Sequence, residues 1–337
     1  MLAPAASRLP TVDLSLAGTS DAADDRIAEQ LDQACREFGF FYLQGHGIDA
    51  AAIDSLMDLS RQFFALDTVA KCRIHMSNGG RAWRGYFRVG DELTSGVPDV
   101  KEGLYFGTEL EATDVRVQKQ WPLHGSNQFP AVPGFRSAVL DYIEAVTNLG
   151  RRLLALLSRG LGLSKTFFEE HYTRDPTILF RIFNYPPTSA VQFKEDSWGV
   201  GAHTDYGLLT LLKQDSVGGL QVRHGDGWID VPDIANSFVC NVGDMLERLT
   251  RGRYLSALHR AKNASDQHRM SMVLFLDPSF TAQLQPIDSV QPAQERPHTD
   301  VRWDDIDPNK TSGTYGEYLL QKVGRVFPEL REQSLKK

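Results

Sequence analysis

His203 and Asp205 lie two residues apart and are the first candidates for chemistry in this chain. In an extended strand, residues i and i+2 point to the same face, so the two side chains can aim at one point. An imidazole nitrogen and a carboxylate oxygen that converge make two thirds of a metal site, provided that a third ligand arrives from elsewhere. A buried polar pair at a strand end is the alternative, and the pair alone favours it.

His259 is the candidate for the third ligand. The sequence separation between Asp205 and His259 is long enough for the chain of a double-sheet barrel to return to the neighbourhood of the first strand. Two histidines and one carboxylate leave one face of a metal open, which is the arrangement used by non-haem Fe(II) oxygenases. The open positions hold a cosubstrate and O₂.

Arg269 and Ser271 follow shortly after His259 and lead into an apolar strand. They share one face of that strand, where a guanidinium fork and a hydroxyl can grip a carboxylate. A surface arginine beside a serine is the structural alternative. The position just downstream of His259 favours the carboxylate site.

The elements that must position these residues lie after Pro176. Eight short strand-like runs with turn signals between them predict an antiparallel barrel or jelly roll. They span 177–184, 199–203, 208–214, 220–223, 228–231, 238–242, 256–260 and 270–276. The first half shows helical periodicity at 22–37, 50–66, 135–161 and 167–171, with short strands at 9–14 and 40–43. We therefore expect a mainly β, α+β fold: a β core with flanking helices.

Residues 79–107 are punctuated by glycines and rich in arginine and aromatic side chains. A long irregular segment inside a compact domain is usually a functional lid or a disordered loop. The aromatic residues argue against disorder, so we predict that this loop is a lid over the substrate.

Composition limits the partners and the compartment. The chain has 337 residues, a net charge of −7 and no block of basic residues, so we expect no nucleic-acid partner. Membrane-length apolar stretches and a signal-peptide pattern are both missing from the sequence, so we expect no membrane association. Three separated cysteines without a C-x-x-C pair suit a reducing cytoplasm. The sequence carries no signal for the oligomeric state.

The chain resembles the 2-oxoglutarate/Fe(II)-dependent oxygenases of the isopenicillin N synthase-like superfamily. The resemblance covers most of the chain, in the expected order. It is carried by His203-Thr-Asp205, Gly207-Leu-Leu-Thr-Leu-Leu212, Gly218-Gly-Leu-Gln-Val222, Asn241-Val-Gly-Asp-Met-Leu246, His259-Arg260 and Arg269-Met-Ser271, together with Phe38-Gly-Phe-Phe41 and Gly45-His-Gly47.

The resemblance implies a double-stranded β-helix (jelly-roll) core. It also implies that His203, Asp205 and His259 bind Fe(II) and that Arg269 and Ser271 bind the distal carboxylate of 2-oxoglutarate. The segment Arg181-Ile-Phe-Asn-Tyr185-Pro-Pro resembles the family pattern that places Tyr185, and with it Arg181, near the cosubstrate. Phe183 stands where that pattern has asparagine, so one polar contact is missing.

Residues 90–102 and Trp121-Pro122 look most like the branch that contains the microbial ethylene-forming enzyme. In that branch the positions matching Arg181 and Tyr206 lie by the active site. We add four residues of the predicted lid to the candidate substrate pocket: Tyr86, Phe87, Glu92 and Phe106. A regular strand would turn Tyr206 away from Asp205, so Tyr206 reaches the pocket only if the strand ends or bends near Gly207.

The predicted organisation is one catalytic unit with three parts. Residues 1–175 form helices and strands that pack on the core, residues 176–280 form the catalytic core, and residues 281–337 form a loop and a helix. The expected activity is oxidation, most simply hydroxylation, of a small molecule with release of succinate and CO₂. The alternatives are an oxidase, cyclase or ethylene-forming activity on the same iron, or a non-catalytic barrel that binds a small ligand.

Overall fold

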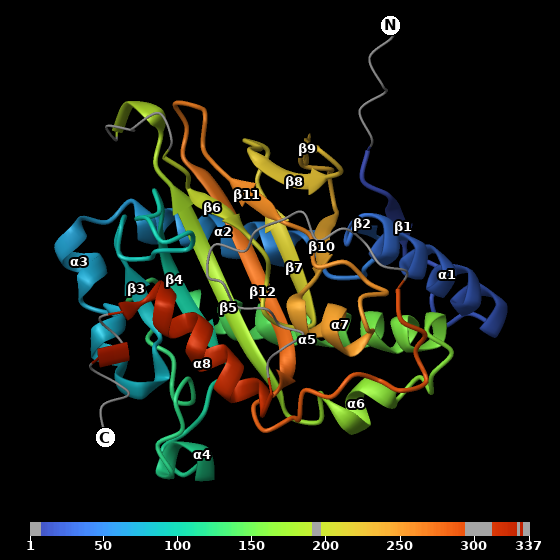
Figure 1. Cartoon of the computed structure of the whole chain (residues 1–337). Helices are drawn as coiled ribbons and strands as arrows, with labels where there is room; N and C mark the ends of the chain where they lie inside the picture. The colour runs from blue at the N-terminus through green and yellow to red at the C-terminus, as the bar shows by residue number, and fades with distance from the viewer. Residues whose placement is uncertain (1–7, 191–196, 294–311, 329–330, 333–337) are drawn as a thin grey trace, which may run out of the picture.

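Two β-sheets form the centre of the molecule, and helices cover the outside (Figure 1). The computed structural model describes residues 8–190, 197–293, 312–328 and 331–332. Residues 1–7 of the N-terminal segment and residues 294–311 of the predicted C-terminal loop lie outside the described residues. The mixed arrangement of strands and helices confirms the predicted α+β class, and the jelly-roll core is confirmed with it.

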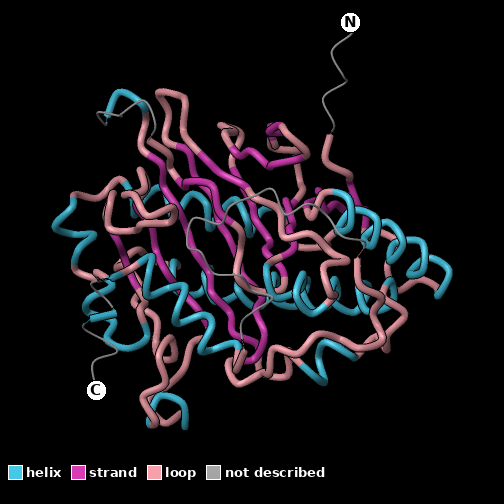
Figure 2. The backbone as a smooth tube through the Cα atoms, viewed as in Figure 1, coloured by secondary structure: helices cyan, strands magenta, loops and turns pink. Residues whose placement is uncertain are grey.

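The large sheet has eight strands in the order β1-β2-β10-β7-β12-β5-β4-β3. Its bounds are Thr11–Asp13 (β1), Phe40–Gln44 (β2), Gly85–Phe87 (β3), Glu102–Gly107 (β4), Pro176–Tyr185 (β5), Leu209–Gln214 (β7), Phe238–Val242 (β10) and Arg269–Ser279 (β12). All pairs are antiparallel except β1 with β2. Figure 2 shows these strands side by side in the middle of the chain trace.

The small sheet has four antiparallel strands in the order β6-β11-β8-β9. Its bounds are Val200–His203 (β6), Leu220–His224 (β8), Gly227–Asp230 (β9) and His259–Ala261 (β11). All eight strand-like runs predicted after Pro176 are therefore strands, with ends shifted by a few residues. The largest shifts, three residues each, are at the start of β11, which begins at His259, and at the end of β12, which extends to Ser279.

The first half contributes four strands to the large sheet, so a boundary at residue 175 separates segments of one sheet. The expectation that 79–107 is a loop throughout is wrong, because β3 and β4 extend the sheet beyond β5. Their glycines are packing positions: the Phe87 ring and the Arg84 guanidinium occupy the space that a Cβ would take at Gly103 and Gly107. Only the stretch between the two strands, residues 88–101, fits the loop prediction.

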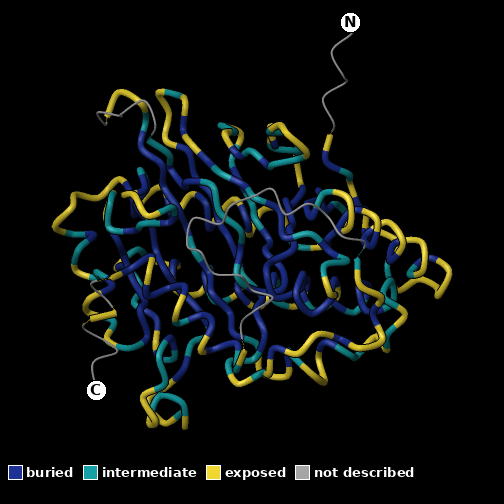
Figure 3. The backbone as a smooth tube through the Cα atoms, in the orientation of Figure 1, coloured by how far each residue is buried: buried dark blue, intermediate teal, exposed yellow. Residues whose placement is uncertain are grey.

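The helices flank the sheets. Their bounds are Asp21–Glu37 (α1), Ala50–Phe64 (α2), Thr68–Cys72 (α3), Val115–Gln118 (α4), Phe135–Gly160 (α5), Phe167–His171 (α6), Asp244–Leu249 (α7) and Tyr315–Val326 (α8), with 3₁₀ turns at Met76–Ala82 (η1) and Thr188–Ala190 (η2). Helix α5 runs behind the large sheet in Figure 1, and α8 crosses in front of it. The backbone of the central strands is largely buried (Figure 3).

Alternation along β12 explains how the two helices reach opposite faces. Leu276 packs on Gly150 of α5, where a Cβ would meet the leucine side chain at 2.7 Å. The next residue, Asp277, accepts a hydrogen bond from Tyr315 of α8.

Among the described residues, no helix combines the length and the apolar character needed to span a membrane.

Candidate active site

The two histidines stand opposite each other in the small sheet. His203 ends β6, His259 begins β11, and the two residues are register partners in the antiparallel pair. Their ring centroids lie 4.2 Å apart, and the ring of Phe40 meets the His259 ring edge-on at 5.1 Å. Strand pairing, and not sequence proximity, therefore brings the second imidazole to the first.

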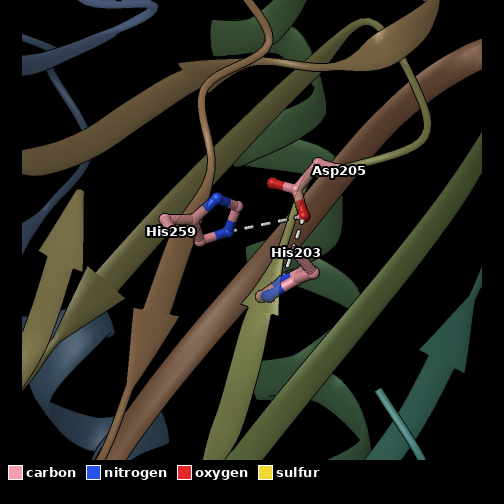
Figure 4. Close-up of side chains that lie close together, drawn as sticks. All are labelled: His203, Asp205 and His259. Atoms are coloured by element: carbon pink, nitrogen blue, oxygen red, sulfur yellow. Dashed lines mark ion pairs between the residues drawn. The ribbon is translucent and has the colours of Figure 1, made fainter. Parts of the chain in front are cut away.

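Asp205 lies just outside β6, so strand alternation is not what turns it toward His203. The strand ends at His203, and the following turn is fastened by backbone hydrogen bonds to the start of α7. Asp205 Oδ1 lies 3.7 Å from Nε2 of each histidine. Figure 4 shows the three side chains converging, with an ion pair from the carboxylate to each imidazole, and one ligand atom of each residue lies within 4.8 Å of the others.

Local hydrogen bonds orient the three ligand atoms. Nδ1 of His203 donates to the Gly201 carbonyl at 2.8 Å, and Nδ1 of His259 donates to the Ala257 carbonyl at 3.2 Å. Because a carbonyl only accepts, the proton sits on Nδ1 and the Nε2 lone pair faces Asp205. Both rings therefore present the nitrogen that a metal ion needs.

The carboxylate is oriented in the same way. Asp205 Oδ2 accepts hydrogen bonds from Thr210 Oγ1 at 2.6 Å and Asn241 Nδ2 at 2.7 Å, which leaves Oδ1 for the site. Burial acts to raise the pKa of Asp205, but the two histidines and these hydrogen bonds outweigh it, and the pKa lies below its usual value. Burial, and then the proximity of His259, lowers the pKa of His203 to about 3. The site thus offers a neutral imidazole and an ionised carboxylate, the protonation states that metal ligands require.

A cavity between the two sheets opens onto this site. Alternate residues of β5 and β12 face it, because odd-numbered positions on both strands share one face. The cavity is lined by Phe40, Glu92, Thr94, Lys101, Tyr105, Leu179, Arg181, Phe183, Tyr185, Val200, His203, Asp205, Tyr206, Gly207, Thr210, Leu212, Leu220, Val239, Asn241, His259, Ala261, Arg269, Val273, Phe275 and Asp277.

Arg269 lines one end of the cavity, which we call the Arg269 end, and Ser271 follows it on the same face of β12. Arg269 is 1% exposed and Ser271 is 0% exposed. The Arg269 Nε donates to the Gly218 carbonyl, and the guanidinium lies 4.4 Å from the centroid of the Tyr185 ring. One terminal nitrogen of Arg269 and the Ser271 hydroxyl have no hydrogen-bond partner among the described residues. Buried polar groups without partners are rare, so this pair is poised to bind an anionic group.

A cluster of paired charges forms the other end, which we call the Arg181 end. Glu92 lies 2.7 Å from both Arg181 and Lys101, one cation on each carboxylate oxygen. Arg181 also donates to the Tyr105 hydroxyl and lies over its ring. Burial acts to raise the pKa of Glu92, but Lys101 and Arg181 outweigh it and hold the pKa below its usual value.

Arg181 is thus grouped with Glu92 and not with Arg269. The register pairs Arg181 with Val273, four residues along β12 from Arg269. At about 3.3 Å per residue, that is roughly 13 Å along the strand. The predicted role of Arg181 in binding the cosubstrate therefore has no structural support from proximity to Arg269, whereas Tyr185 lies directly beside that residue.

The structure brings two of the five predicted substrate-pocket residues to the cavity. Glu92 and Tyr206 line it, and Tyr206 does so because the strand ends at His203, as its placement required. Tyr86, Phe87 and Phe106 are not among the residues that line the cavity. Tyr86 donates to buried Glu102, Phe87 packs on Phe183 and Phe327, and Phe106 packs on aromatic residues on the side of α5. The neighbour of Phe106, Tyr105, faces the cavity instead.

Sequence reasoning missed several residues of the site. Lys101, Tyr105 and Asp277 line the cavity, and Thr210 and Asn241 hold Asp205. Two of these carried a readable signal: Thr210 and Asn241 both lie in motifs quoted for the resemblance. The positions of Lys101, Tyr105 and Asp277 depend on pairings between distant strands.

The donor set fits Fe(II), and the Arg269 end fits a dicarboxylate cosubstrate. Two imidazole nitrogens and one carboxylate oxygen on one side leave the other positions of an iron open. Arg269 lines the same cavity, and its unpartnered nitrogen, with the Ser271 hydroxyl two residues along the strand, matches a carboxylate at the far end of such a cosubstrate.

Family models match both halves of the chain. Residues 9–132 match the N-terminal region described as "non-haem dioxygenase in morphine synthesis N-terminal". Residues 175–278 match the 2OG-Fe(II) oxygenase superfamily. The second match contains all three candidate ligands together with Arg269 and Ser271.

Relatives match almost the entire chain. A Dictyostelium discoideum protein named "Probable iron/ascorbate oxidoreductase" is 44% identical, over 97% of both chains. A 1-aminocyclopropane-1-carboxylate oxidase from Dictyostelium mucoroides is 35% identical, over 96% of both chains. A homoarginine-6-hydroxylase from Glycine max is 37% identical, over 96% of this chain and 98% of its own.

Solved structures agree in fold. A 2OG-Fe(II) oxygenase family protein from Caulobacter crescentus has a TM-score of 0.77 and 27% identity, covering 94% of this chain and 98% of its own. A Neurospora crassa protein, solved with alpha-KG and thymine, has a TM-score of 0.77 at 24% identity, covering 96% of this chain and 98% of its own. With the family models, the relatives and the assembled His-Asp-His site in agreement, this chain belongs to the 2-oxoglutarate/Fe(II)-dependent oxygenase superfamily.

Proposed function

We propose that this 2-oxoglutarate-dependent dioxygenase hydroxylates a C–H bond of a small amino acid. The observation that carries the proposal is the Arg181 end of the cavity, where buried charges of both signs lie beside apolar side chains. An amino acid carries both signs of charge. Relatives named for homoarginine hydroxylation and for oxidation of 1-aminocyclopropane-1-carboxylate support the same substrate class.

The metal ligands have a defined task in this proposal. His203, Asp205 and His259 would hold Fe(II), which when bound supplies O₂ activation coupled to oxidative decarboxylation of 2-oxoglutarate. Thr210 and Asn241 keep Asp205 Oδ1 directed at the metal position by occupying Oδ2. Such outer hydrogen bonds fix the ligand and tune its basicity.

At the Arg269 end, Arg269 and Ser271 would bind the distal carboxylate of 2-oxoglutarate. The guanidinium is held by Gly218 and by the Tyr185 ring, so its free nitrogen is already oriented. A preorganised donor costs little entropy on binding. The alternative of an oxidase or cyclase without 2-oxoglutarate leaves these two buried donors without a purpose.

At the Arg181 end, Arg181 would receive the substrate carboxylate. Its Nε has no hydrogen-bond partner among the described residues, while its two terminal nitrogens serve Glu92 and Tyr105. Phe183 and Phe275 flank the guanidinium and keep water away. Residues 88–101, which carry Glu92 and Lys101, remain our candidate for a segment that closes over the substrate.

A non-catalytic barrel is the weaker alternative, because it predicts a broken ligand set and the set is complete. We also infer a cytoplasmic location, supported by Cys35, Cys72 and Cys240, which are free thiols.

The test is succinate release from 2-oxoglutarate by Fe(II)-loaded protein with a panel of substrates. Homoarginine, arginine, lysine and 1-aminocyclopropane-1-carboxylate are compared with the amines that lack their carboxylate and with thymine. We expect at least one amino acid, and not its amine, to stimulate succinate release and to gain one oxygen by mass spectrometry. Headspace ethylene identifies the alternative outcome on the same iron. Stimulation by thymine or by the amines alone would reject the amino-acid proposal.

A further inference from the structure

Asp244 lies at a junction between the two segments that carry metal ligands. Its backbone N–H donates to the Asp205 carbonyl at 2.7 Å, which fixes the turn directly after the second ligand. Its Oδ1 accepts a hydrogen bond from Ser256 Oγ at 2.8 Å, three residues before His259. The side chain of Asp244 is fully buried. A shift of Asp244 would therefore move both Asp205 and the approach to His259.

The turn after Asp205 has little freedom apart from Asp244. The N–H groups of Gly243 and Met245 donate to the carbonyls of Leu208 and Gly207, both at 3.0 Å. A Cβ on Gly243 would collide with the backbone of Gly207, so the two segments are in direct backbone contact. The first turn of α7 is thus the surface against which the metal-ligand turn is held.

Helix α8 approaches the same junction from the C-terminal part of the chain. Tyr318 donates to Asp244 Oδ2 at 2.8 Å, and the Lys322 ammonium lies 3.8 Å from the same oxygen. Lys322 is only 2% exposed. Its ammonium lies 5.3 Å from the centroid of the Tyr206 ring, and Tyr206 lines the cavity. A lysine buried to this degree needs a partner that compensates its charge, and Asp244 is one.

The C-terminal end of α8 reaches the opposite wall of the cavity. The Leu93 N–H donates to the Val326 carbonyl at 3.1 Å, and Leu93 follows Glu92 of the Arg181 end. Phe327 packs against Tyr105, another residue of that end. Helix α8 therefore contacts the metal-ligand turn near its middle and the charged wall at its end.

We propose that Lys322 and Tyr318 are positioning residues for the metal site, which act through Asp244. In this role α8 holds Asp244, and Asp244 holds the turn of Asp205 and the segment before His259. The proposal concerns the metal site of the family and does not depend on the identity of the substrate. Under this proposal α8, which is far from the ligands in the sequence, contributes to the metal affinity.

The test measures metal binding apart from turnover. Mn(II), as a stand-in for Fe(II), is titrated into the metal-free full chain with 2-oxoglutarate present, and free Mn(II) is followed by electron paramagnetic resonance. The variants are Lys322→Met, which removes the charge and keeps the length, and Tyr318→Phe, which removes only the hydroxyl. The control is Gln321→Met, an exposed position on the same helix.

We expect Lys322→Met to weaken Mn(II) binding by about tenfold, the low end of the range for residues that support metal ligands. Tyr318→Phe is expected to weaken it less, and Gln321→Met to leave it unchanged. Hydrogen exchange at the Asp244 amide should quicken in the first two variants only, because that amide holds the Asp205 carbonyl. The double variant Asp244→Asn/Lys322→Met, which removes both charges, should regain part of the lost affinity.

A merely structural role gives a different result. Lys322→Met and Tyr318→Phe would then lower the melting temperature while the Mn(II) affinity and the Asp244 exchange rate stay within about twofold of the wild type. That outcome overturns the proposal. If Lys322→Met does not fold, Tyr318→Phe alone decides, since loss of one hydroxyl is a small change and the same two measurements apply.

Discussion

The two ends of the cavity use buried charge in opposite ways. At the Arg269 end, donors of Arg269 and Ser271 are left without partners among the described residues. At the Arg181 end, Glu92 is shared between Arg181 and Lys101, Lys101 also pairs with Asp99, and the charges largely compensate one another. The first end is prepared for an anion of fixed shape. At the Arg181 end the charged groups are paired with one another, so a ligand can bind only to the polar atoms that these pairs leave free. This arrangement suits a substrate whose identity differs between relatives.

Loss of a metal ligand should have the largest effect, because both proposed binding sites, one at each end of the cavity, depend on the same iron. His203→Ala is expected to reduce Mn(II) binding and succinate release to background, since it removes one of three ligands. The exposed His171→Ala should leave both unchanged. Metal titration and a succinate assay provide the measurement. Near wild-type metal affinity in His203→Ala would contradict the assignment of the metal site.

Glu92→Gln should show most clearly that the two ends of the cavity are independent of each other. It leaves buried Arg181 without its carboxylate, while Lys101 keeps its pair with Asp99. Breaking a buried pair costs about 3–5 kcal/mol of unfolding free energy. The exposed Glu111→Gln should change it by less than about 0.5 kcal/mol. Urea unfolding gives the free energies. The affinity for 2-oxoglutarate, measured by calorimetry, should stay near the wild-type value in folded Glu92→Gln; an equal loss at both ends would contradict their independence.

Arg269→Gln tests the other end. Truncating one partner of a buried charged hydrogen bond costs about 2–5 kcal/mol, which is roughly 30-fold or more in the dissociation constant of 2-oxoglutarate. Ser271→Ala should cost about 0.5–1.5 kcal/mol, a few-fold change. Calorimetry on the Mn(II)-loaded protein measures both. The unfolding free energy of Arg269→Gln should not fall as far as that of Glu92→Gln, because no buried ion pair is broken. A similar fall would contradict the difference between the two ends.

Asp277, which lines the same cavity, makes the stability of the protein depend on pH. Burial, and then the neighbouring Asp205, raises the pKa of Asp277 from 3.8 to about 7, although the Tyr315 hydrogen bond and Arg181 oppose the rise. Between those pH values the native carboxyl keeps a proton that the unfolded chain has lost. The free energy of unfolding should therefore fall as pH rises, by at most about 1.4 kcal/mol per pH unit.

The measurement is urea unfolding of the chelator-treated protein at several pH values from about 4.5 to 7, within the window between the two pKa values. Asp277→Asn cannot lose a proton, so its stability relative to the wild type should increase steadily across this range. Parallel stability curves for the two proteins would show that Asp277 is ionised throughout.

Much of the site could be predicted because its signals are local or in fixed order. His203, Asp205 and His259 have residue types that few other chemistries require together, and Arg269 and Ser271 share a strand face whatever the fold. The eight strands after Pro176 were readable because turn residues separate them. These features depend on neighbouring residues and on the order of motifs, both of which are written in one sequence.

The remainder depended on which face and which partner each residue meets. Phe106 was predicted to face the pocket, but Tyr105 does. The register of β4 on β5 decides which of two neighbouring residues points into the cavity. Gly103 suggested a loop, whereas it accommodates Phe87 within a sheet. Asp277 gave no local signal, since its role arises from contacts with Tyr315 and the 205–207 turn.

The shared carboxylate of Glu92 has a consequence for how this enzyme can acquire new substrates. Its two cations come from different segments, Lys101 before β4 and Arg181 within β5, so a change at any one of the three leaves an uncompensated charge in the interior. We expect single substitutions there to lower the amount of folded protein, which opposes their selection for activity. Diversification of this lineage should therefore proceed through apolar neighbours such as Phe183 and Phe275, or through paired replacements. Libraries built for directed evolution should be designed in the same way.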